Sequence, residues 1–279
     1  MADTAYQTLY REEFIAGFER GTSLLRGSVT TEAQVNGNQA IFLVADSGAA
    51  SAVTRGVNGL IPARADSLTQ NTCTLAEWHD LVRRSKFNLE HSQGNGRAIA
   101  QKTTMKVINR KIDDDILAAL ANTTLNTGAS ITASLSLVMK SITILGNNNV
   151  DIEDEDNMFG VITPAFNAFL MQVKEYASAD YVESKPLSGP ARKYRRWAGV
   201  NWIRHTGISG IGTSTEDCFL YHRDAIGHAI SKDSLDPVAG YNEEQAYYYT
   251  RCSATMGSKL LQNAGVVNMN HDGSSYVAA

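Results

Sequence analysis

The residues whose types could support chemistry are histidines and carboxylates in the second half of the chain. His205, His222 and His228 occur in neighbouring segments that are predicted as strands, and they could converge on a divalent metal. None of them has the spacing of a helical zinc motif such as HExxH. A metal-dependent hydrolase that uses His222, His228 and the carboxylates at 151–156 is one alternative. It predicts a bound divalent metal and loss of activity in His222→Ala.

The acidic residues form two local runs. The run at 151–156 lacks the glycine and the terminal glutamate of a twelve-residue calcium loop, so a solvated loop is the favoured interpretation. Asp113, Asp114 and Asp115 are consecutive in a predicted helix and point in different directions, which is poor geometry for paired acid and base carboxylates. We expect this second run to lie on a helix surface that faces solvent or a partner.

The other reactive or phosphate-binding candidates are weak. Cys73, Cys218 and Cys252 are far apart and odd in number, which argues against a disulfide framework and predicts buried or idle thiols. The segment GISGIG at 207–212 follows a predicted strand but leads into Thr-Ser-Thr and not into a helix, so it is interpreted as a glycine-rich turn. No catalytic constellation, cofactor or metal is predicted.

Charged and apolar residues outside these runs suit contacts better than catalysis. Four of the five residues at 192–196 are basic and could contact phosphates, although a solvated connector is the simpler interpretation. A helix predicted at 5–20 would form an N-terminal arm whose apolar side needs a partner surface. Our candidates for assembly or charged interfaces are Phe14, Phe18, Arg55, Arg64, Arg192, Lys193, Arg195 and Arg196.

Composition excludes several classes of protein. A hydrophobic share of 43% over 279 residues excludes wholesale disorder and allows one or two domains. The chain has 25 basic and 29 acidic residues, which is not the overall charge of a dedicated nucleic-acid binder. No apolar run approaches the ~18 residues that span a bilayer, and the N-terminus does not resemble a signal peptide. We expect a soluble protein made in a cytoplasm, with no membrane contact.

A long amphipathic helix at 97–121 is the element around which the chain is organised. Its apolar residues recur at steps of three or four and line one side, with Lys106, Arg110, Asp113 and Asp114 turned elsewhere. A length of about 25 residues gives a rod of roughly 37 Å, along which something large must lie. The apolar stripe is Met105, Ile108, Ile112, Ile116 and Leu120.

A β-hairpin and a long excursion are predicted at 27–74. Asn36-Gly37 stands between two strand-like runs and is the strongest local signal for a hairpin turn. The second strand leads into a glycine-rich stretch that offers little to a core. Since a structureless loop longer than ~15 residues is uncommon in compact domains, this excursion is expected to serve binding or assembly.

Two further helices are expected, one that starts at 74 and ends before Gly94 and one at 134–145. The sequence Thr74-Leu-Ala-Glu77 matches a capping box, which favours a helix start there. The second helix has an apolar stripe and Gly146 at its end. The expected buried faces are Leu75, Trp78, Leu81 and Val82 in the first and Leu135, Val138, Met139, Ile142 and Leu145 in the second.

The second half mixes strands and helices. A buried strand is predicted at 158–163, and Thr163-Pro164 predicts an N-cap followed by a proline in the first helical turn. The expected core face of that helix is Phe166, Phe169, Leu170 and Val173. Further strands are predicted at 197–203, 218–222, 246–255 and 265–270, with a loop at 231–244.

The order of these segments, together with NRKIDDDILAAL, GVITP and FLYHRDAIGHAI, resembles the major capsid proteins of tailed phages of the Hong Kong 97 type. The resemblance covers nearly the whole chain. It implies an α+β fold with an N-terminal arm at 1–26, an extended β-hairpin loop at 27–74, a peripheral domain with the spine helix at 75–130 and 245–279, and an axial domain at 131–244.

The same resemblance implies a function through contacts. The chain would assemble with itself as pentamers and hexamers into the icosahedral head of a virion, built in the bacterial cytoplasm around non-specifically held double-stranded DNA. A separate scaffolding protein and a portal are expected partners, and a decoration protein is a further one. An encapsulin-like compartment shell is the alternative within the fold, and an isolated binding module would leave the hairpin and the arm unexplained.

Two departures from some family members affect maturation. No long prodomain precedes the arm, which favours a separate scaffolding protein. The extended-loop region at 27–74 contains no lysine, so we predict no lysine-to-asparagine cross-link through that loop.

Overall fold

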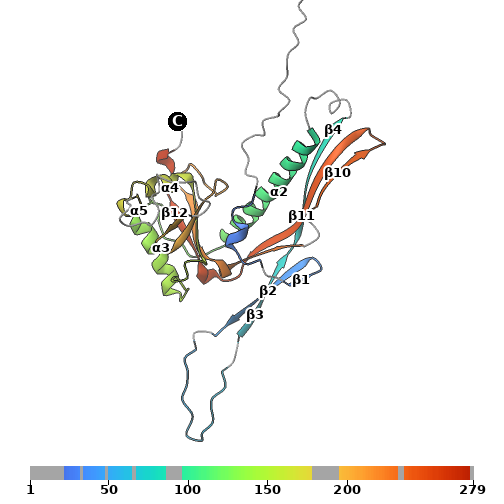
Figure 1. Cartoon of the computed structure of the whole chain (residues 1–279). Coiled ribbons are helices and arrows are strands. Elements are labelled where there is room, and N and C mark those ends of the chain that lie inside the picture. Colours follow the sequence, from blue (N-terminus) through green and yellow to red (C-terminus); the bar gives the residue numbers. More distant parts are fainter. Residues whose placement is uncertain are drawn as a thin grey trace, which may run out of the picture. The chain divides into compact units, whose positions relative to one another are not determined.

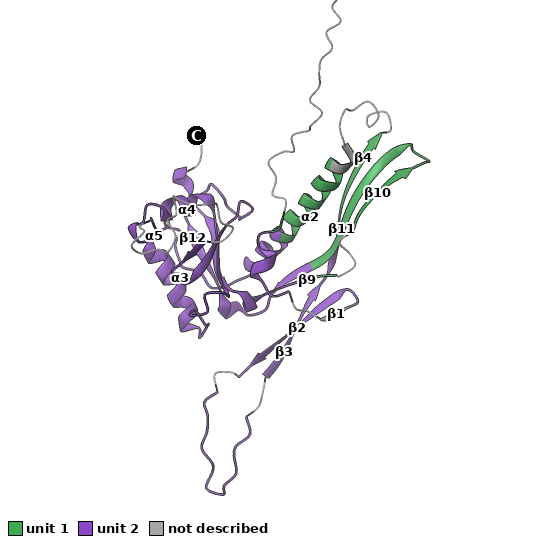
Figure 2. Cartoon of the chain, in the orientation of Figure 1, with its two compact units in different colours: residues 1–23, 77–112, 230–256 green, residues 24–76, 113–229, 257–279 purple. Residues whose placement is uncertain are grey.

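The computed structural model describes residues 22–31, 34–47, 50–64, 67–85, 96–177, 195–231 and 236–276. These residues form two compact units (Figure 2), one within the ranges 1–23, 77–112 and 230–256 and the other within the ranges 24–76, 113–229 and 257–279. The described part of the chain contains no helix that is long and apolar enough to cross a membrane. The predicted helix at 5–20 lies outside the described residues.

In the described chain four strands come first, the two longest helices follow, and most of the later elements are strands (Figure 1). The helices are α2 (Gly96–Leu120), α3 (Leu135–Asn147), α4 (Pro164–Leu170) and α5 (Lys174–Ala177). The first six strands are β1 (Gln34–Asn36), β2 (Gln39–Asp46), β3 (Ser67–Thr74), β4 (Ala76–Ser85), β5 (Met158–Ile162) and β6 (Arg195–Trp197). The remaining strands are β7 (Val200–Arg204), β8 (Glu216–His222), β9 (Ile226–Ile230), β10 (Asp236–Asn242), β11 (Tyr247–Leu260) and β12 (Val266–His271).

The first unit places the N-terminal part of α2 against a sheet in the order β10-β11-β4, in which β9 also pairs with β11. Alternate residues of β11, from Thr250 to Met256, are buried. Cys252 Sγ lies 3.6 Å from the sulfur of Met105 on α2, so this face of the sheet is the one that the helix covers. On β4, the ring of Trp78 lies under the Lys111 ammonium, 3.9 Å from the ring centroid.

The long helix predicted at 97–121 is confirmed, and α2 begins and ends within one residue of the predicted bounds. Ile108, Ile112, Ile116 and Leu120 are buried as expected, while Met105 is half-buried. The expectation that Asp113 is turned away from the buried side was wrong, because this residue is only 2% exposed. Residues at this point of the helix are enclosed on more than one side, which sequence periodicity alone does not reveal.

Two predictions in the first unit were wrong. The capping box at residue 74 does not start a helix, because residues 76–85 form β4 and pair within the sheet next to β11. Trp78 and Leu81, expected in a buried face, are 37% and 44% exposed. The loop expected at 231–244 contains β10, which pairs with β11 along its whole length. Pairing with a long neighbouring strand outweighed the local signals in both segments.

The predicted hairpin is confirmed in the second unit. β1 pairs with β2 through a two-residue turn at Gly37 and Asn38, and Gly37 has a φ of +63°, which a residue with a side chain rarely adopts. β2 then pairs with β3 in unbroken antiparallel register from Gln39 opposite Thr74 to Asp46 opposite Ser67.

A five-stranded sheet in the order β12-β8-β5-β7-β6 forms the centre of the second unit. The central strand β5 is buried at every residue, as the sequence predicted. The start of α4 is also confirmed, because the Thr163 side chain accepts a hydrogen bond from Phe166 N and Pro164 follows it. Phe166 and Leu170 are buried, and Phe169 and Val173 pack at the edge of the core.

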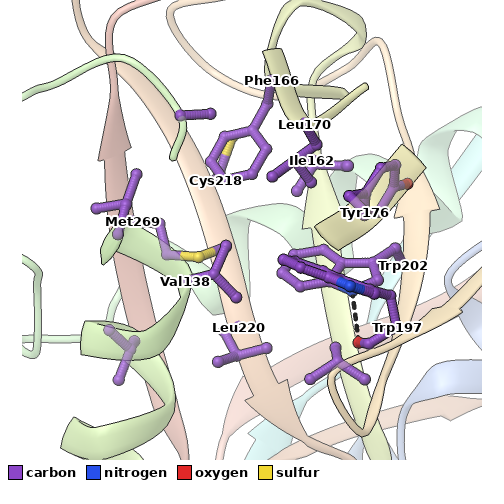
Figure 3. Packing of buried hydrophobic residues seen from close by; sticks show 14 of the residues in the cluster. Val138, Ile162, Phe166, Leu170, Tyr176, Trp197, Trp202, Cys218, Leu220 and Met269 are labelled. Atoms are coloured by element: carbon purple, nitrogen blue, oxygen red, sulfur yellow. Dashed lines mark hydrogen bonds between the residues drawn. The ribbon is translucent and has the colours of Figure 1, made fainter. Parts of the chain in front are cut away.

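The core of the second unit joins α3 and α4 to this sheet (Figure 3). Trp197 and Trp202 lie next to each other, and Trp202 Nε1 donates to the carbonyl oxygen of Trp197 at 3.0 Å. A Cβ at Gly160 would stand 2.6 Å from the Trp202 ring, so the indole packs directly on the backbone of β5. This close packing fixes the sheet and the helices as one layered body.

Two smaller expectations about the second unit need correction. The buried face of α3 is shifted, because Leu137 is buried while Met139, expected in the core, is 42% exposed. The strand expected at 197–203 is split into β6 and β7 by a turn in which Ala198 and Gly199 both have positive φ. Strands β8, β11 and β12 are confirmed at the predicted places, with β11 extending to residue 260.

Candidate functional site

The extension between β2 and β3 is the most exposed part of the described chain. Every one of residues 50–64 is exposed, and they contain a turn in which Gly56 N bonds to Leu60 O and Gly59 N to Gly56 O. Four apolar side chains in this segment are exposed to solvent: Val53, Val57, Leu60 and Ile61, between 61% and 107% exposed. Its two charged residues are Arg55 and Arg64.

The hairpin that carries this loop is buried at its base and bare toward its tip. At the base, Ala40, Phe42 and Cys73 belong to a small core cluster with Leu75 and Ala229. Further along the same strands, Leu43 and Leu68 are about three-quarters exposed. The base is therefore held by its own subunit, whereas the tip presents apolar surface that no described residue covers.

A buried carboxylate fastens the chain that follows the predicted N-terminal arm. Asp113 accepts hydrogen bonds from the backbone nitrogens of Leu24 and Leu25, at 3.1 Å each. His205 Nε2 lies 3.3 Å from the same carboxylate, and Nδ1 of that ring accepts from Gly207 N at 2.9 Å. Since Nδ1 accepts, the ring proton is on Nε2, which donates to Asp113. The cluster links α2, the backbone at Leu24 and Leu25, and His205 directly after β7.

The same segment is held further by β8 and β9. Ser28 Oγ donates to Leu25 O at 2.7 Å, so the Tyr221 hydroxyl, 2.6 Å away, donates to Ser28. Thr30 N bonds to Ile226 O, and His228 N bonds to Thr30 O. Leu25 and Val29 are fully buried. The chain that leads from the arm is thus anchored at both ends of residues 24–30, and sequence analysis missed this anchor because its partners are distant in sequence.

The structure places only part of the predicted basic cluster. Arg195 donates to Tyr176 O at 2.8 Å and its guanidinium stacks on the Tyr176 ring, 3.8 Å from the centroid. Partial burial lowers the pKa of Arg195. Arg196 pairs with Asp156 and donates to the side chain of Asn201. Arg192, Lys193, Phe14 and Phe18 lie outside the described residues.

The three candidate histidines are in separate environments. His205 is bound to Asp113, His222 pairs with Asp224, and His228 Nδ1 lies 2.8 Å from Ser258 Oγ. Burial lowers the pKa of His228 to about 4, and the charge of Arg26 acts in the same direction. Among the residues that the structure describes, no group of three or more His, Cys, Asp or Glu side chains is placed to hold a metal ion.

A second buried polar cluster joins β8, α4 and β12. Glu216 accepts from the Thr163 hydroxyl at 2.5 Å and from Gly212 N at 2.8 Å. His271 Nε2 lies 3.8 Å from the Glu216 carboxylate, and burial lowers the pKa of this histidine. Glu216, Thr163 and His271 are all fully buried, so no substrate reaches them and their role is to fix the segments that they join.

The three cysteines are free and buried, as predicted. Burial raises the pKa of Cys218 to about 12, which keeps this thiol protonated and unreactive. The pKa of Cys73 is raised as well, mainly by burial, with the nearby Asp115 carboxylate adding to the effect. None of the clusters in the described chain therefore combines reactive groups with access for a substrate.

Comparison with solved structures identifies the class of fold. A chain of Mycobacterium phage Che8 has a TM-score of 0.75 at 14% identity and covers 98% of this chain and 99% of its own. The capsid of the native GTA particle has a TM-score of 0.69 at 14% sequence identity, and 93% of each chain is covered. The capsid of Ralstonia phage GP4 has a TM-score of 0.68 at 12% sequence identity, and the match covers 97% of this chain and 95% of the GP4 chain. The fold is that of phage capsid subunits of the Hong Kong 97 type.

The sequence itself gives the family. The family model for phage capsid proteins matches residues 2–273. The chain therefore belongs to the phage capsid protein family and is a major capsid protein, a component of the virion that assembles from repeated subunits. A search of curated proteins finds no significant match.

Proposed function

We propose that this major capsid protein forms the pentamers and hexamers of an icosahedral head that encloses double-stranded DNA, and that it has no catalytic activity of its own. Assembly would take place in the bacterial cytoplasm with a separate scaffolding protein and a portal, and a decoration protein could bind the finished head. In this proposal residues 27–74 are the extended loop, residues 75–130 and 245–279 the peripheral domain, and residues 131–244 the axial domain.

The observation that carries the proposal is the exposed apolar side chains of residues 50–64. Burying a side chain of this size is worth about 1.5–3 kcal/mol, so four of them provide about 6–12 kcal/mol before the cost of ordering the loop. In an isolated subunit these side chains stay exposed to water and this free energy is not gained. It is gained when a neighbouring copy covers them, and in a closed shell every subunit covers the loop of one neighbour while its own loop is covered by another.

The anchor at residues 24–30 suits the same role. It fixes Leu24 and Leu25, the residues that follow the predicted arm, and in this proposal Phe14 and Phe18 contact a neighbouring subunit. Arg55 and Arg64 on the loop, and Arg192, Lys193, Arg195 and Arg196, stay predictions as interface residues. The lack of lysine at 27–74 supports a shell that is held by such contacts without cross-links through the loop.

The test is the size of the assembled product. The chain is expressed alone and with the neighbouring open reading frames, and the products are examined by light scattering and negative-stain electron microscopy. We expect closed icosahedral particles when the scaffolding protein is present, with a portal at one vertex. A monomer or dimer under every condition would contradict the proposal, and closed particles that need a cargo protein and no portal would favour the compartment shell.

A further inference from the structure

The first part of the spine helix is charged with one sign only. Between Gly96 and Ile112 the sequence contains five basic residues and no acidic residue. Three of them, Lys102, Lys106 and Arg110, are spaced four residues apart and therefore follow one line along the helix. Lys102 and Arg110 are exposed and Lys106 is half-buried. At ~1.5 Å per residue, this basic stripe extends over about 12 Å.

The basic stripe lies on the opposite side of α2 from the side that packs in its own unit. The buried line of this part of the helix is Ala100, Thr104, Ile108 and Ile112. Lys102 follows Ala100 by two residues, which at 100° each is a rotation of about 200°. Lys111, one of the two basic residues outside the stripe, is instead held over Trp78 on the sheet side. The stripe therefore faces away from the sheet of its unit.

The local charges reinforce this positive surface. Neither Lys102 nor Lys106 forms an ion pair within the described part of the chain. The described carboxylates of the unit are elsewhere: Glu77 pairs with His79 on β4, Asp80 follows on the same strand, and two glutamates lie in the turn between β10 and β11. The helix macrodipole is also positive toward Gly96, at the Lys102 end of the stripe. Asp114, which follows Arg110 by four residues, is acidic and ends the basic stripe.

We propose that the basic stripe of α2 is the surface of this subunit that contacts the phosphates of packaged double-stranded DNA. This inference rests on the proposed function and adds to it the face of the subunit that is turned to the interior of the head. The cluster at 192–196 is the other basic run, but Arg195 is stacked on Tyr176 and Arg196 is paired with Asp156, so these two charges are already used within the subunit.

A duplex is the occupant that the charges favour. The stripe has a few positive charges in a row and lacks the pocket or mixed polar groups that would read a base sequence, which suits weak contact with a phosphate backbone. Contacts of this kind release counterions, so affinity falls with salt at a slope of about 0.9 per phosphate neutralised. Repetition over a shell would make many weak contacts sufficient to order DNA against the wall.

The experiment measures the salt dependence of binding to a 30-base-pair duplex of arbitrary sequence, by fluorescence anisotropy with unassembled subunit between about 50 and 200 mM salt. The test variant is Lys102→Gln with Lys106→Gln. The matched control is Lys174→Gln with Arg223→Gln, which removes two exposed cations from the other unit. A third variant, Lys102→Arg with Lys106→Arg, keeps the charges. Circular dichroism checks that each variant is folded.

We expect the slope of log affinity against log salt to fall in magnitude by about 1.8 for the Gln pair and to stay at the wild-type value for the other two variants. An unchanged slope for the Gln pair, or an equal change in the control pair, would overturn the inference. Loss of shells with an unchanged slope would also overturn it, because the stripe would then meet a protein partner. Failure of the wild type to form shells at all would count against the proposed function instead.

Discussion

Apolar side chains are buried in one region of the second unit and exposed in another. Around the five-stranded sheet, Phe166, Trp202 and their neighbours are enclosed by α3 and α4 within the same chain. In the extended loop, Val57, Leu60 and Ile61 are left in water. The first arrangement stabilises the subunit alone, whereas the second is costly for an isolated subunit. In the proposed function a neighbouring copy covers the second group, so that one group of side chains folds the protein and the other assembles it.

The largest expected effect on the free energy of unfolding is in the buried core around the five-stranded sheet. Phe166→Ala should lower the free energy of unfolding by about 3–5 kcal/mol, because the ring is fully buried between the sheet and α4. Leu60→Ala, its counterpart in the extended loop, should change the same quantity by less than about 0.5 kcal/mol. Urea unfolding of the unassembled subunits measures both. Equal losses in the two variants would show that the loop is packed in the free subunit.

A second prediction concerns the pH dependence of folding. The pKa of His228 is about 4 in the folded subunit against an ordinary value of 6.5, so between these values the unfolded chain binds the proton first. The stability contribution is therefore complete above pH 6.5 and is lost as the pH falls toward 4. The loss attributable to this residue is about 3 kcal/mol.

The check is urea unfolding of wild type and His228→Gln at a series of pH values. The variant should lose less stability than the wild type between pH 6.5 and 4. It should keep some pH dependence, since burial lowers the pKa of His271 as well. Parallel curves for the two proteins would contradict the assignment.

The third effect probes the buried cluster at Glu216. A glutamine at this position keeps one acceptor oxygen, so either the Thr163 hydroxyl or Gly212 N loses its partner. Glu216→Gln should therefore cost about 1–3 kcal/mol in the free energy of unfolding. Glu155→Gln, an exposed carboxylate, is the control and should change it by less than about 0.5 kcal/mol. A Glu216 variant as stable as the control would refute the structural role.

The smallest expected effect is the absence of a covalent product. Because residues 27–74 contain no lysine, we expect no ladder of cross-linked subunits through the loop when mature particles are run on a denaturing gel. All of the protein should migrate as a single chain. A ladder that persists after boiling and reduction would show that covalent bonds hold the shell together.

Sequence reasoning was sufficient where the signal is local and repeated. The stripe of α2, the Thr163-Pro164 start of α4 and the turn at Gly37 each depend on residues within a few positions of one another. The capping box at residue 74 is just as local, yet it failed, because pairing within the sheet decides the structure of residues 76–85. Local signals predict an element only where no distant strand competes for it.

The functional surfaces were predictable to different degrees. The segment that contains residues 50–64 stood out in the sequence because its glycines and Pro62 offer little to a core. The role of Asp113 was not predictable from the sequence, because its partners Leu24, Leu25 and His205 are 88 to 92 positions away. The charges of the basic stripe are visible in sequence, but which side of α2 packs against the sheet follows from the structure.

The most direct test of the account uses the extended loop itself. Val57→Ser, Leu60→Ser and Ile61→Ser are combined in one subunit, with Ser51→Thr and Thr54→Ser in the same loop as the matched control, and sedimentation velocity gives the fraction of protein in shells. We predict that the triple variant stays folded and soluble but forms no shells, while the control assembles like the wild type. Shell formation by the triple variant at the wild-type yield would contradict the claim that exposed apolar residues of this loop hold the capsid together.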